Sequence, residues 1–370
     1  MVGPTALWDL SEPPSDLTIS LDGHPYDHPA ELLAALHWPE AARLEAEVAH
    51  SVAALALARV GAASLGRHTV AFADQDLVEH EQRVVDGHRL HPCCRNRTGF
   101  RAEDHLAYGP EHRPVVALDL LACPYAPARG IRAARRWPAS ATDPGCRCGR
   151  DQRCPHPDLA VVLRACPTAV LRPGETILPV GALTARPPDG GCPPLCLLAA
   201  THPVAWLADF VALALPPLLT LLAWGIALEA HEQNLLLVVS QGRPRRLIYR
   251  DLADIWLCAT RLKAAGSSCP AVPNRMRASS AELRAKLFST FVATTLTGLV
   301  TTLAKHADSR RLWDTVGLGI RQTYASLPNT RATQADQHAL LNEPIPAKPL
   351  TLMRINPDTT LWAYQPNPFN

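Results

Sequence analysis

The stretch Gly225–Asn234, GIALEAHEQN, places a run of polar and ionisable side chains between an apolar segment and an apolar, strand-like segment. Burying such groups costs free energy unless they are paired or used. On an α-helix Glu229 and His231 would point about 200° apart, whereas in an extended chain they share one face with Gln233. We therefore expect an extended backbone here, or one that is leaving a helix. Such a face can polarise a carbonyl, hold a cation and hydrogen-bond a nucleotide; the alternative is the polar cap of a helix end.

The segments on either side of this stretch set the local fold. Residues 210–228 are uncharged for 19 residues, which is long enough for a membrane span. The interpretation that we prefer is a pair of core helices, because Pro216 and Pro217 interrupt the run. After the motif, residues 235–239 and 246–251 read as two strands of a hairpin joined by a Gly-Arg-Pro turn.

Helical periodicity marks both ends of the chain. Residues 29–63 carry apolar side chains at helical spacing, which predicts two amphipathic helices separated near Pro39. Residues 280–305 show the same spacing, with Ser280 and Glu282 as start signals. Shorter apolar stretches predict single elements: a buried strand or helix at 115–122, and strands at 159–165 and 175–185.

A Pro-, Gly- and Cys-rich connection over residues 124–157 is the best candidate for a domain boundary. We expect an N-terminal helical region over 1–123, a middle region over 124–200, and a C-terminal catalytic region over 201–370. The C-terminal region would be mainly helical and carry the hairpin.

The overall charge excludes a simple electrostatic partner. There are 36 Lys and Arg against 34 Asp and Glu, so the chain gives no argument for nucleic acid or an acidic membrane surface. Its first residues do not read as a secretion signal, which predicts a cytoplasmic location. The odd count of 11 cysteines then favours reduced thiols.

Four soft ligands in the connection raise an alternative. Cys146, Cys148, Cys154 and His156 lie in a turn-rich stretch and could hold a structural zinc ion. The spacing lacks the paired CxxC knuckles of common zinc sites, so we favour a loop with incidental thiols and predict no metal site.

Two further segments carry charge suited to an anion. Gly87–Phe100, GHRLHPCCRNRTGF, crowds His88, His91, Arg95 and Arg97 into one turn-rich stretch, and arginine offers a bidentate fork to carboxylate or phosphate. Zinc is disfavoured there because the two adjacent cysteines cannot easily share one tetrahedral ion.

The second segment, KPLTLMR at 348–354, begins with one of only four lysines in the chain and reads as a strand ending in arginine. A basic group at this place could close over an anionic substrate. A solvated strand end is the alternative.

Taken in order, these segments resemble the IucA/IucC family of siderophore synthetases that work without a peptide-synthetase template. The family pattern GHPxHPxxKxRxGF is similar to 87–100, with Arg89 in place of proline and Arg95 in place of lysine. The pattern GIALEAHxQN is matched throughout at 225–234. Later family positions are matched by the following residues: Arg250, Asp251, Lys348, Met353 and Arg354.

The resemblance implies a hand-shaped α+β fold, here with a shortened N-terminal and middle part. It also implies siderophore biosynthesis: ATP and Mg²⁺ would adenylate a carboxylate of citrate or a related acid, and an amine or hydroxyl would displace AMP. A homodimer is implied as well, with small-molecule substrates and neither nucleic acid nor membrane as partner.

Carried over position by position, the resemblance makes His231 a catalytic residue at the reacting carboxylate. It assigns the nucleotide and its Mg²⁺ to Glu229 and Asp251, and ATP binding to Gln233 and Asn234. Arg95, from its segment, is predicted to bind the cofactor.

On the acid side, the resemblance places two further catalytic histidines, His88 and His91. Lys348 is predicted to bind the acid substrate, and so is Arg97.

The family also carries a Ser-x-Arg-Thr segment that clamps ATP phosphates, and this segment is not found in the sequence. Three hypotheses follow. The first is an active synthetase in which Arg129, Arg132, Arg135 or Arg136 replaces the clamp. The second is a non-catalytic paralogue that binds a citrate-like ligand or a partner synthetase. The third is a zinc-stapled interaction protein.

Overall fold

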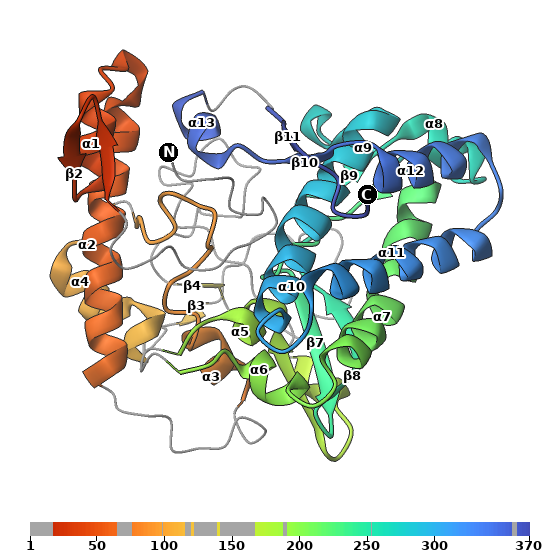
Figure 1. Cartoon of the computed structure of the whole chain (residues 1–370), viewed down its shortest axis with the longest axis horizontal. Helices are drawn as coiled ribbons and strands as arrows, with labels where there is room; N and C mark the ends of the chain where they lie inside the picture. The colour runs from red at the N-terminus through yellow and green to blue at the C-terminus, as the bar shows by residue number, and fades with distance from the viewer. Residues whose placement is uncertain are drawn as a thin grey trace.

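The computed structural model describes residues 18–64, 76–97, 99–114, 120–121, 139–140, 167–187, 191–252, 254–356 and 361–370. N-terminal helices stand on one side of the molecule, and the helices of the C-terminal half gather on the other (Figure 1). The cysteine cluster at 146–156, the arginines at 129–136 and the predicted strand at 159–165 lie outside the described residues. Of the predicted element at 115–122, the structure describes β3, Leu120–Leu121, which pairs with β4, Ala139–Ser140.

The N-terminal part confirms the predicted break near Pro39. A short hairpin, β1 (Ile19–Leu21) and β2 (His24–Tyr26), precedes α1 (Pro29–Ala35), the 3₁₀ turn η1 (Pro39–Ala41) and α2 (Ala42–Ser64). Proline opens both α1 and η1, where its missing N–H would be unpaired in any case. Leu44 and Val48 of α2 face a small core that also holds Cys93.

Short elements fill the middle of the chain. They are α3 (Leu77–Gln82), α4 (Ala102–Tyr108), η3 (Pro110–His112), η5 (Pro167–Val170), β5 (Glu175–Pro179), α5 (Val180–Thr184) and α6 (Pro194–Ala199). The predicted strand over 175–185 is therefore half right, since the chain turns into helix at Val180.

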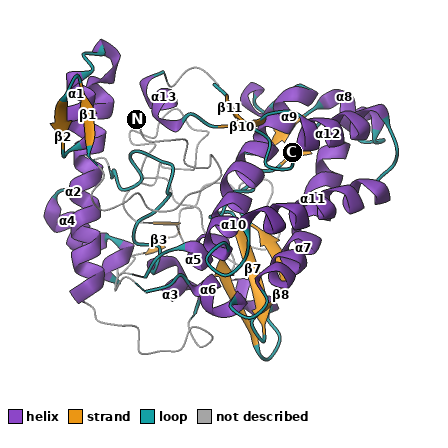
Figure 2. Cartoon of the chain, in the orientation of Figure 1, coloured by secondary structure: helices purple, strands orange, loops and turns teal. Residues whose placement is uncertain are grey.

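A three-stranded antiparallel sheet of order β5-β7-β8 lies at the base of the C-terminal half (Figure 2). The hairpin of β7 (Leu235–Ser240) and β8 (Arg243–Tyr249) confirms the predicted pair of strands. Its turn is Gln241-Gly242 rather than Gly-Arg-Pro, and both residues have positive φ, as the tightest hairpin turns require. Leu235 to Val239 are all buried, because β7 is the central strand.

The long apolar stretch is one helix, α7 (Pro203–Trp224), and the predicted pair of helices is wrong. Pro216 and Pro217 lie inside it without ending it. The helix ends at Gly225, whose φ is +99°. A Cβ at this position would lie close to Arg261 and only 2.9 Å from Cys258 O. Only glycine satisfies both constraints without strain, so this residue turns the chain into the motif.

Three described helices are long and apolar enough to cross a membrane by length and composition: Pro39–Ser64, Pro203–Trp224 and Ser280–Leu303. The last is 94% buried inside the protein over its most apolar window, and the second 44%.

The predicted helix at 280–305 is confirmed, with an unexpected middle. It consists of α9 (Ser280–Leu287), the π-helix η7 (Phe288–Leu296) and α10 (Thr297–Leu303). Ser279 is its N-cap, in a capping box with Glu282.

The remaining elements of the C-terminal half are β6 (Ile226–Ala227), β9 (Trp256–Leu257), α8 (Ala259–Ala264), η6 (Asn274–Met276), α11 (Ser309–Ser326), α12 (Arg331–Asn342), β10 (Ile345–Ala347), α13 (Leu350–Ile355) and β11 (Ala363–Gln365). The predicted strand at 348–354 is wrong, because most of that segment is α13. This helix lies between the two sides of the molecule (Figure 1).

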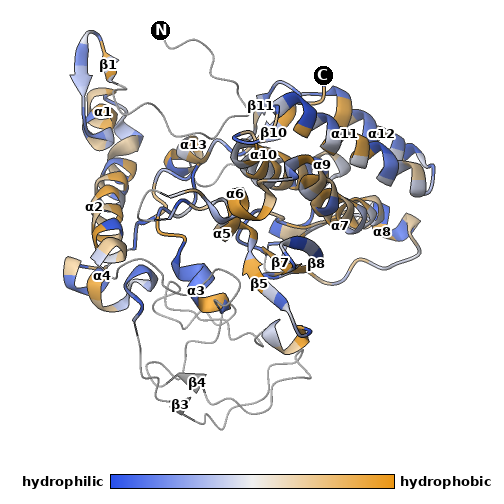
Figure 3. Ribbon diagram, turned by 60° about the horizontal axis from the view of Figure 1, so that its bottom comes forward, coloured by the Kyte–Doolittle hydropathy of each residue, from blue (hydrophilic) through white to orange (hydrophobic). Residues whose placement is uncertain are grey.

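One main core holds the C-terminal half together. Much of α7 and α10 is hydrophobic, whereas α11 and α12 carry hydrophilic and hydrophobic stripes (Figure 3). Trp206 and Phe210 of α7 stack at 6.0 Å between ring centroids and are fully buried. Large apolar side chains of this kind each contribute about 1.5–3 kcal/mol on burial.

A buried ion pair crosses this core. The guanidinium of Arg261, from α8, donates two hydrogen bonds of 2.6 and 2.7 Å to the Asp336 carboxylate of α12. Arg261 also donates to Leu222 O near the end of α7, and Arg284 of α9 donates to Asp336 at 3.3 Å. Three helices therefore meet at one carboxylate that is 1% exposed, and Arg261 joins α7 to them.

Replacing Asp336→Asn leaves the Arg261 guanidinium buried without its counter-ion. We expect a loss of about 3–5 kcal/mol in the free energy of unfolding, measured by urea denaturation. The control is Asp314→Asn, which breaks an exposed ion pair of 3.0 Å with Arg310 and should cost less than about 1 kcal/mol. Equal losses in the two variants would contradict a special role for the buried pair.

Candidate functional site

The GIALEAHEQN stretch leaves α7 through Gly225 and forms β6 before it reaches the polar residues. Glu229 and His231 lie in a non-helical turn, with His231 N donating to Glu229 O at 3.0 Å. Their side chains point toward each other, with His231 Nε2 3.9 Å from Glu229 Oε2. The prediction of a backbone that has left the helix is confirmed.

The Glu229 carboxylate is the centre of a charged cluster. Its Oε1 accepts hydrogen bonds from Lys348 Nζ at 2.5 Å and from Lys286 Nζ at 2.9 Å. Lys348 follows β10, and Lys286 lies on α9, so three distant segments meet at one oxygen. Burial opposes the ionisation of Glu229, but the charges of Lys348 and Lys286 outweigh it and lower its pKa to about 2.

Lys286 is a site residue that sequence reasoning missed. Its side chain is 1% exposed, it also donates to Asp254, and its ammonium lies 5.2 Å from the ring centroid of Trp256. A buried lysine is rare unless it is paired. The signal that could have identified it is the scarcity of lysine in the sequence, the same signal that pointed to Lys348.

Two predicted histidines face each other across the site. The rings of His88 and His231 lie 6.5 Å apart between centroids, and those of His88 and His91 are also 6.5 Å apart. Desolvation of the ring and the positive charges nearby lower the pKa of His88 to about 4, although the residue as a whole is exposed. Desolvation likewise lowers the pKa of His231. Both imidazoles are therefore neutral at pH 7.

His231 keeps an unused ring nitrogen. Its Nδ1 is buried and makes no hydrogen bond within the described part of the chain. A neutral imidazole with a free nitrogen can accept or donate one proton at a bound group.

Asn234 connects the two ends of the polar segment, since its side-chain amide donates to the backbone Glu229 O at 3.1 Å. Tyr249 of β8 accepts a hydrogen bond from Glu229 N at 3.1 Å. Gln233 is exposed, and its carbonyl accepts from Arg250 Nε. Asp251 is exposed as well, with a φ of +72°.

The two predicted anion-binding arginines are engaged elsewhere. Arg97 forms a bidentate pair of 2.8 and 2.9 Å with Glu111, which is 3% exposed. Arg95 lies 3.8 Å from the same carboxylate and donates to Val85 O. The structure thus gives both arginines protein partners and does not bring them together with Glu229.

The π-helix η7 explains how a residue of α9 and a residue near the end of η7 both contact the motif. Lys286 reaches Glu229, and Thr295 Oγ1 donates to Ala230 O at 2.8 Å. Nine residues of α-helix make about two and a half turns, which would put these two side chains on opposite sides. The wider π turn brings them to the same side, as π segments at functional sites often do.

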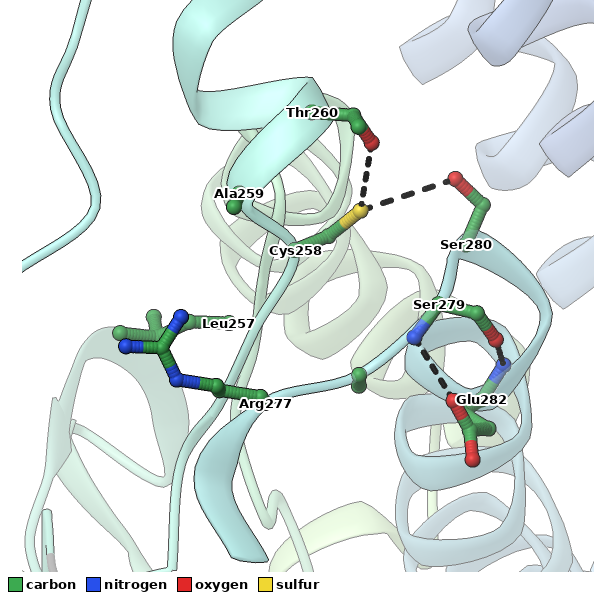
Figure 4. Close-up of a pocket in the computed structure, with 9 residues that line it drawn as sticks. Leu257, Cys258, Ala259, Thr260, Arg277, Ser279, Ser280 and Glu282 are labelled. Carbon is green, nitrogen blue, oxygen red and sulfur yellow. Dashed lines mark hydrogen bonds between the residues drawn. The ribbon is translucent and has the colours of Figure 1, made fainter. Parts of the chain in front are cut away.

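The described residues contain no group of three or more His, Cys, Asp or Glu side chains placed to hold a metal ion. A separate pocket of about 450 Å³ adjoins α8 and α9, and its lining includes none of the predicted site residues. In it the Cys258 thiol lies between the hydroxyls of Thr260 and Ser280 (Figure 4). Burial opposes ionisation of this thiol, but these hydrogen bonds lower its pKa.

Comparisons with known proteins agree with the motifs. The model of the IucA / IucC family matches residues 76–130, which include the His88 segment. The rhizobactin siderophore biosynthesis protein RhbF of Rhizobium meliloti (strain 1021) is 34% identical over 134 residues. The chain is therefore similar to the IucA/IucC family over part of its length. The match covers 35% of this chain and 22% of RhbF, so the chain spans far less than two thirds of that relative.

The fold of this chain matches a solved synthetase along nearly its whole length. The ATP-bound aerobactin synthetase IucA from a hypervirulent pathotype of Klebsiella pneumoniae aligns over 95% of this chain and 88% of its own, with a TM-score of 0.64 and 16% identity. The predicted α+β synthetase fold is confirmed. The petrobactin biosynthesis protein AsbB of Bacillus anthracis str. Sterne aligns over 54% of this chain and 36% of its own, at 23% identity and a TM-score of 0.48.

A second family model, described as ferric iron reductase FhuF-like transporter, matches residues 204–361. That range contains Glu229, His231, Lys286 and Lys348.

The charged cluster predicts a defined pH dependence of stability. Because the pKa of Glu229 is lowered in the folded state, its contribution is full above the ordinary pKa of about 4.5 and is lost as the pH falls toward 2. We expect the stability gap between the protein and its Glu229→Gln variant to narrow by roughly 2 kcal/mol from pH 7 to pH 3, measured by urea unfolding.

The control is Lys348→Met, which removes the leading cause of the lowered pKa. In that background the pKa of Glu229 in the folded state lies closer to its ordinary value, so the loss should be smaller and should be complete at a higher pH. A gap that is independent of pH in both backgrounds would show that Glu229 is not held by its lysines.

Proposed function

We propose that this chain works in siderophore biosynthesis as an ATP-dependent ligase that adenylates a carboxylate of citrate or a related acid. The observation that carries the proposal is the convergence of Lys286 and Lys348 on Glu229, beside a neutral His231. The IucA/IucC relationship and the name of RhbF support the pathway. The ATP-bound state of the IucA neighbour supports the nucleotide.

The cluster has the charges that the reaction needs. Attack of a carboxylate on the α-phosphate of ATP forms an acyl adenylate and releases pyrophosphate, and negative charge builds up on phosphorus-bound oxygens. Two buried or half-buried ammoniums stabilise such charge well, because little water screens them. Each charge-assisted hydrogen bond of this kind contributes about 1.5–3 kcal/mol.

In the second step an amine or hydroxyl attacks the acyl carbon and AMP leaves. The nucleophile must lose a proton as the new bond forms. His231 is neutral and has a free Nδ1, so it is suited to accept that proton or to polarise the carbonyl. His88 stands opposite and is neutral too.

The lysines at this site could also replace the positive charge of the Ser-x-Arg-Thr segment that is not found in the sequence. Lys286 is an alternative source of positive charge for the phosphates, in place of the arginines at 129–136, which lie outside the described residues. A lysine is a point charge and lacks the fork of arginine, so orientation of the phosphates would come from other groups.

Mg²⁺ fits the carboxylates of the site in chemistry. Hard oxygen ligands suit this ion, and it is usually bound by one or two carboxylates plus substrate phosphates. Glu229 and Asp251 would hold it, as the family resemblance implies, and it would neutralise phosphate charge. Asp254, which already pairs with Lys286, is a further oxygen donor nearby.

A pyrophosphate-release assay with ATP, Mg²⁺, citrate and a panel of polyamines and amino alcohols tests the proposal. We expect citrate-dependent release, reduced by about 10²-fold or more in His231→Ala and by 10- to 100-fold in Lys286→Met. Lys305→Met removes an exposed lysine outside the cluster and is the matched control, with activity within two-fold of the parent.

Release that is absent with citrate, succinate and 2-oxoglutarate would sink the ligase proposal. If citrate then raises the melting temperature and ATP does not, the chain is a non-catalytic paralogue that binds the acid, since a ligand of the folded state stabilises it.

The FhuF-like match favours a second candidate, the handling of a ferric iron complex. Reduction of Fe(III) to Fe(II) requires an electron donor, and a bound flavin, haem or iron–sulfur group in that role would give the purified protein a visible absorption band. Fe(III) reduction with such a band, and no pyrophosphate release, would favour this candidate over the ligase.

A further inference from the structure

Glu232 is an ionisable residue of the GIALEAHEQN motif for which the proposed chemistry has no use. Its carbonyl accepts a hydrogen bond from Gly181 N at 3.1 Å, and its Oε2 accepts from Thr184 Oγ1 at 3.3 Å. Oε1 is buried and makes no hydrogen bond within the described residues. The side chain is therefore directed away from solvent, toward α5.

Gly298 leaves room for this carboxylate. A Cβ at position 298 would lie 2.0 Å from Glu232 Oε1, a distance that real Cβ atoms do not reach. Gly298 lies in α10, where glycine costs about 1 kcal/mol relative to alanine. The helix thus carries an unfavourable residue at the point where Glu232 needs space.

Thr184 connects Glu232 to the other histidine segment. The guanidinium of Arg89 donates to Thr184 O, and its positive charge acts on the Glu232 carboxylate. Arg89 follows His88 directly in sequence. A continuous set of contacts therefore joins the residue after His231 to the residue after His88.

We propose that Glu232, Thr184 and Arg89 form a bridge that sets the His88 ring opposite the His231 ring. Glu232 is then a positioning residue, and Gly298 is the position that admits it. The structural part stands on contacts alone, whereas any effect of the bridge on catalysis rests on the proposed ligase function.

The bridge is sensitive to pH. Burial raises the pKa of Glu232 to about 7, opposed by Arg89 and by the Thr184 hydroxyl. Arg89 is the charged group that faces it from the His88 segment, while α5 and α10 present Thr184 and Gly298. The folded state thus holds a proton that the unfolded state releases near pH 4.5, so this residue lowers stability as the pH rises from 4.5 to 7.

The test follows the pKa of His88 by NMR, with labelled histidine and no nucleotide or acid present. In Glu232→Ala we expect the pKa of His88 to rise from about 4 toward its ordinary value by at least about one unit, because the ring leaves its desolvated place beside His231. Arg89→Met, at an exposed residue, should give the same direction of shift if Glu232→Ala folds poorly.

The matched control is Thr295→Val, which removes a different anchor of the same motif, the hydrogen bond to Ala230 O. It should lower the melting temperature and leave the pKa of His88 unchanged. An unchanged pKa in both bridge variants, or an equal shift in the control, would overturn the proposal.

Two melting experiments test the packing. Gly298→Ala should lower the melting temperature by about 2 °C or more despite the better helix propensity of alanine, and Glu232→Ala in the same chain should recover most of the loss. Glu232→Gln should melt higher than the parent at pH 8 and not at pH 4.5. No recovery in the double variant would contradict the assigned packing.

These readouts hold whether or not the chain is a ligase. If pyrophosphate release fails and the His88 shift is observed, the bridge stands and the ligase proposal falls. If release is observed and the shift is not, the bridge falls alone.

Discussion

The Glu229 carboxylate, held by the ammoniums of Lys286 and Lys348, is the interaction on which the arrangement of the C-terminal half depends. It joins residues that are 57 and 119 positions apart in the chain. A buried lysine such as Lys286 is tolerated because it is fully paired, with Asp254 as second partner. Lys348 lies between β10 and α13, so its contact with Glu229 also fixes the start of α13. In α13, Arg354 donates to Glu47 of α2 at 2.9 Å. One carboxylate thus orders both the site and the connection between the two sides of the molecule.

The π-helix is the geometric condition for this arrangement. Regular α-helix from Ser280 to Leu303 would bury the same apolar stripe, but it would turn either Lys286 or Thr295 away from the motif. The i→i+5 winding over Phe288–Leu296 keeps both directed at 229–230, and it is followed at once by Gly298, which admits Glu232. Backbone irregularity is therefore concentrated where α9 and α10 meet the polar segment. The surrounding core, with Phe288, Phe291 and Leu296 buried, holds it in place.

The sequence predicted the features that are local in origin. The break at Pro39, the hairpin after the motif and the face shared by Glu229 and His231 follow from turn residues, strand periodicity and the cost of burying polar groups. Features set by tertiary contact were missed. Pro216 and Pro217 do not end α7, because the packed core outweighs the local penalty. Lys286 sits in a helical pattern where a lysine normally faces solvent, and the partners that bury it lie elsewhere in the chain. The pairing of Arg95 and Arg97 with Glu111 is also a tertiary contact that the local sequence does not show.

The charge balance of the cluster limits what can bind there. At neutral pH two ammoniums face two carboxylates, Glu229 and Asp254, while His88 and His231 are uncharged. An anion that enters must compete with Glu229 for the lysines, and like charges at close range in a poorly solvated site repel strongly. Glu229 must then move toward another cation or share its lysines. Under the proposed ligase function, a divalent ion bound with the nucleotide would be that other cation. A negatively charged acid should therefore bind more tightly after the metal–nucleotide complex than before it.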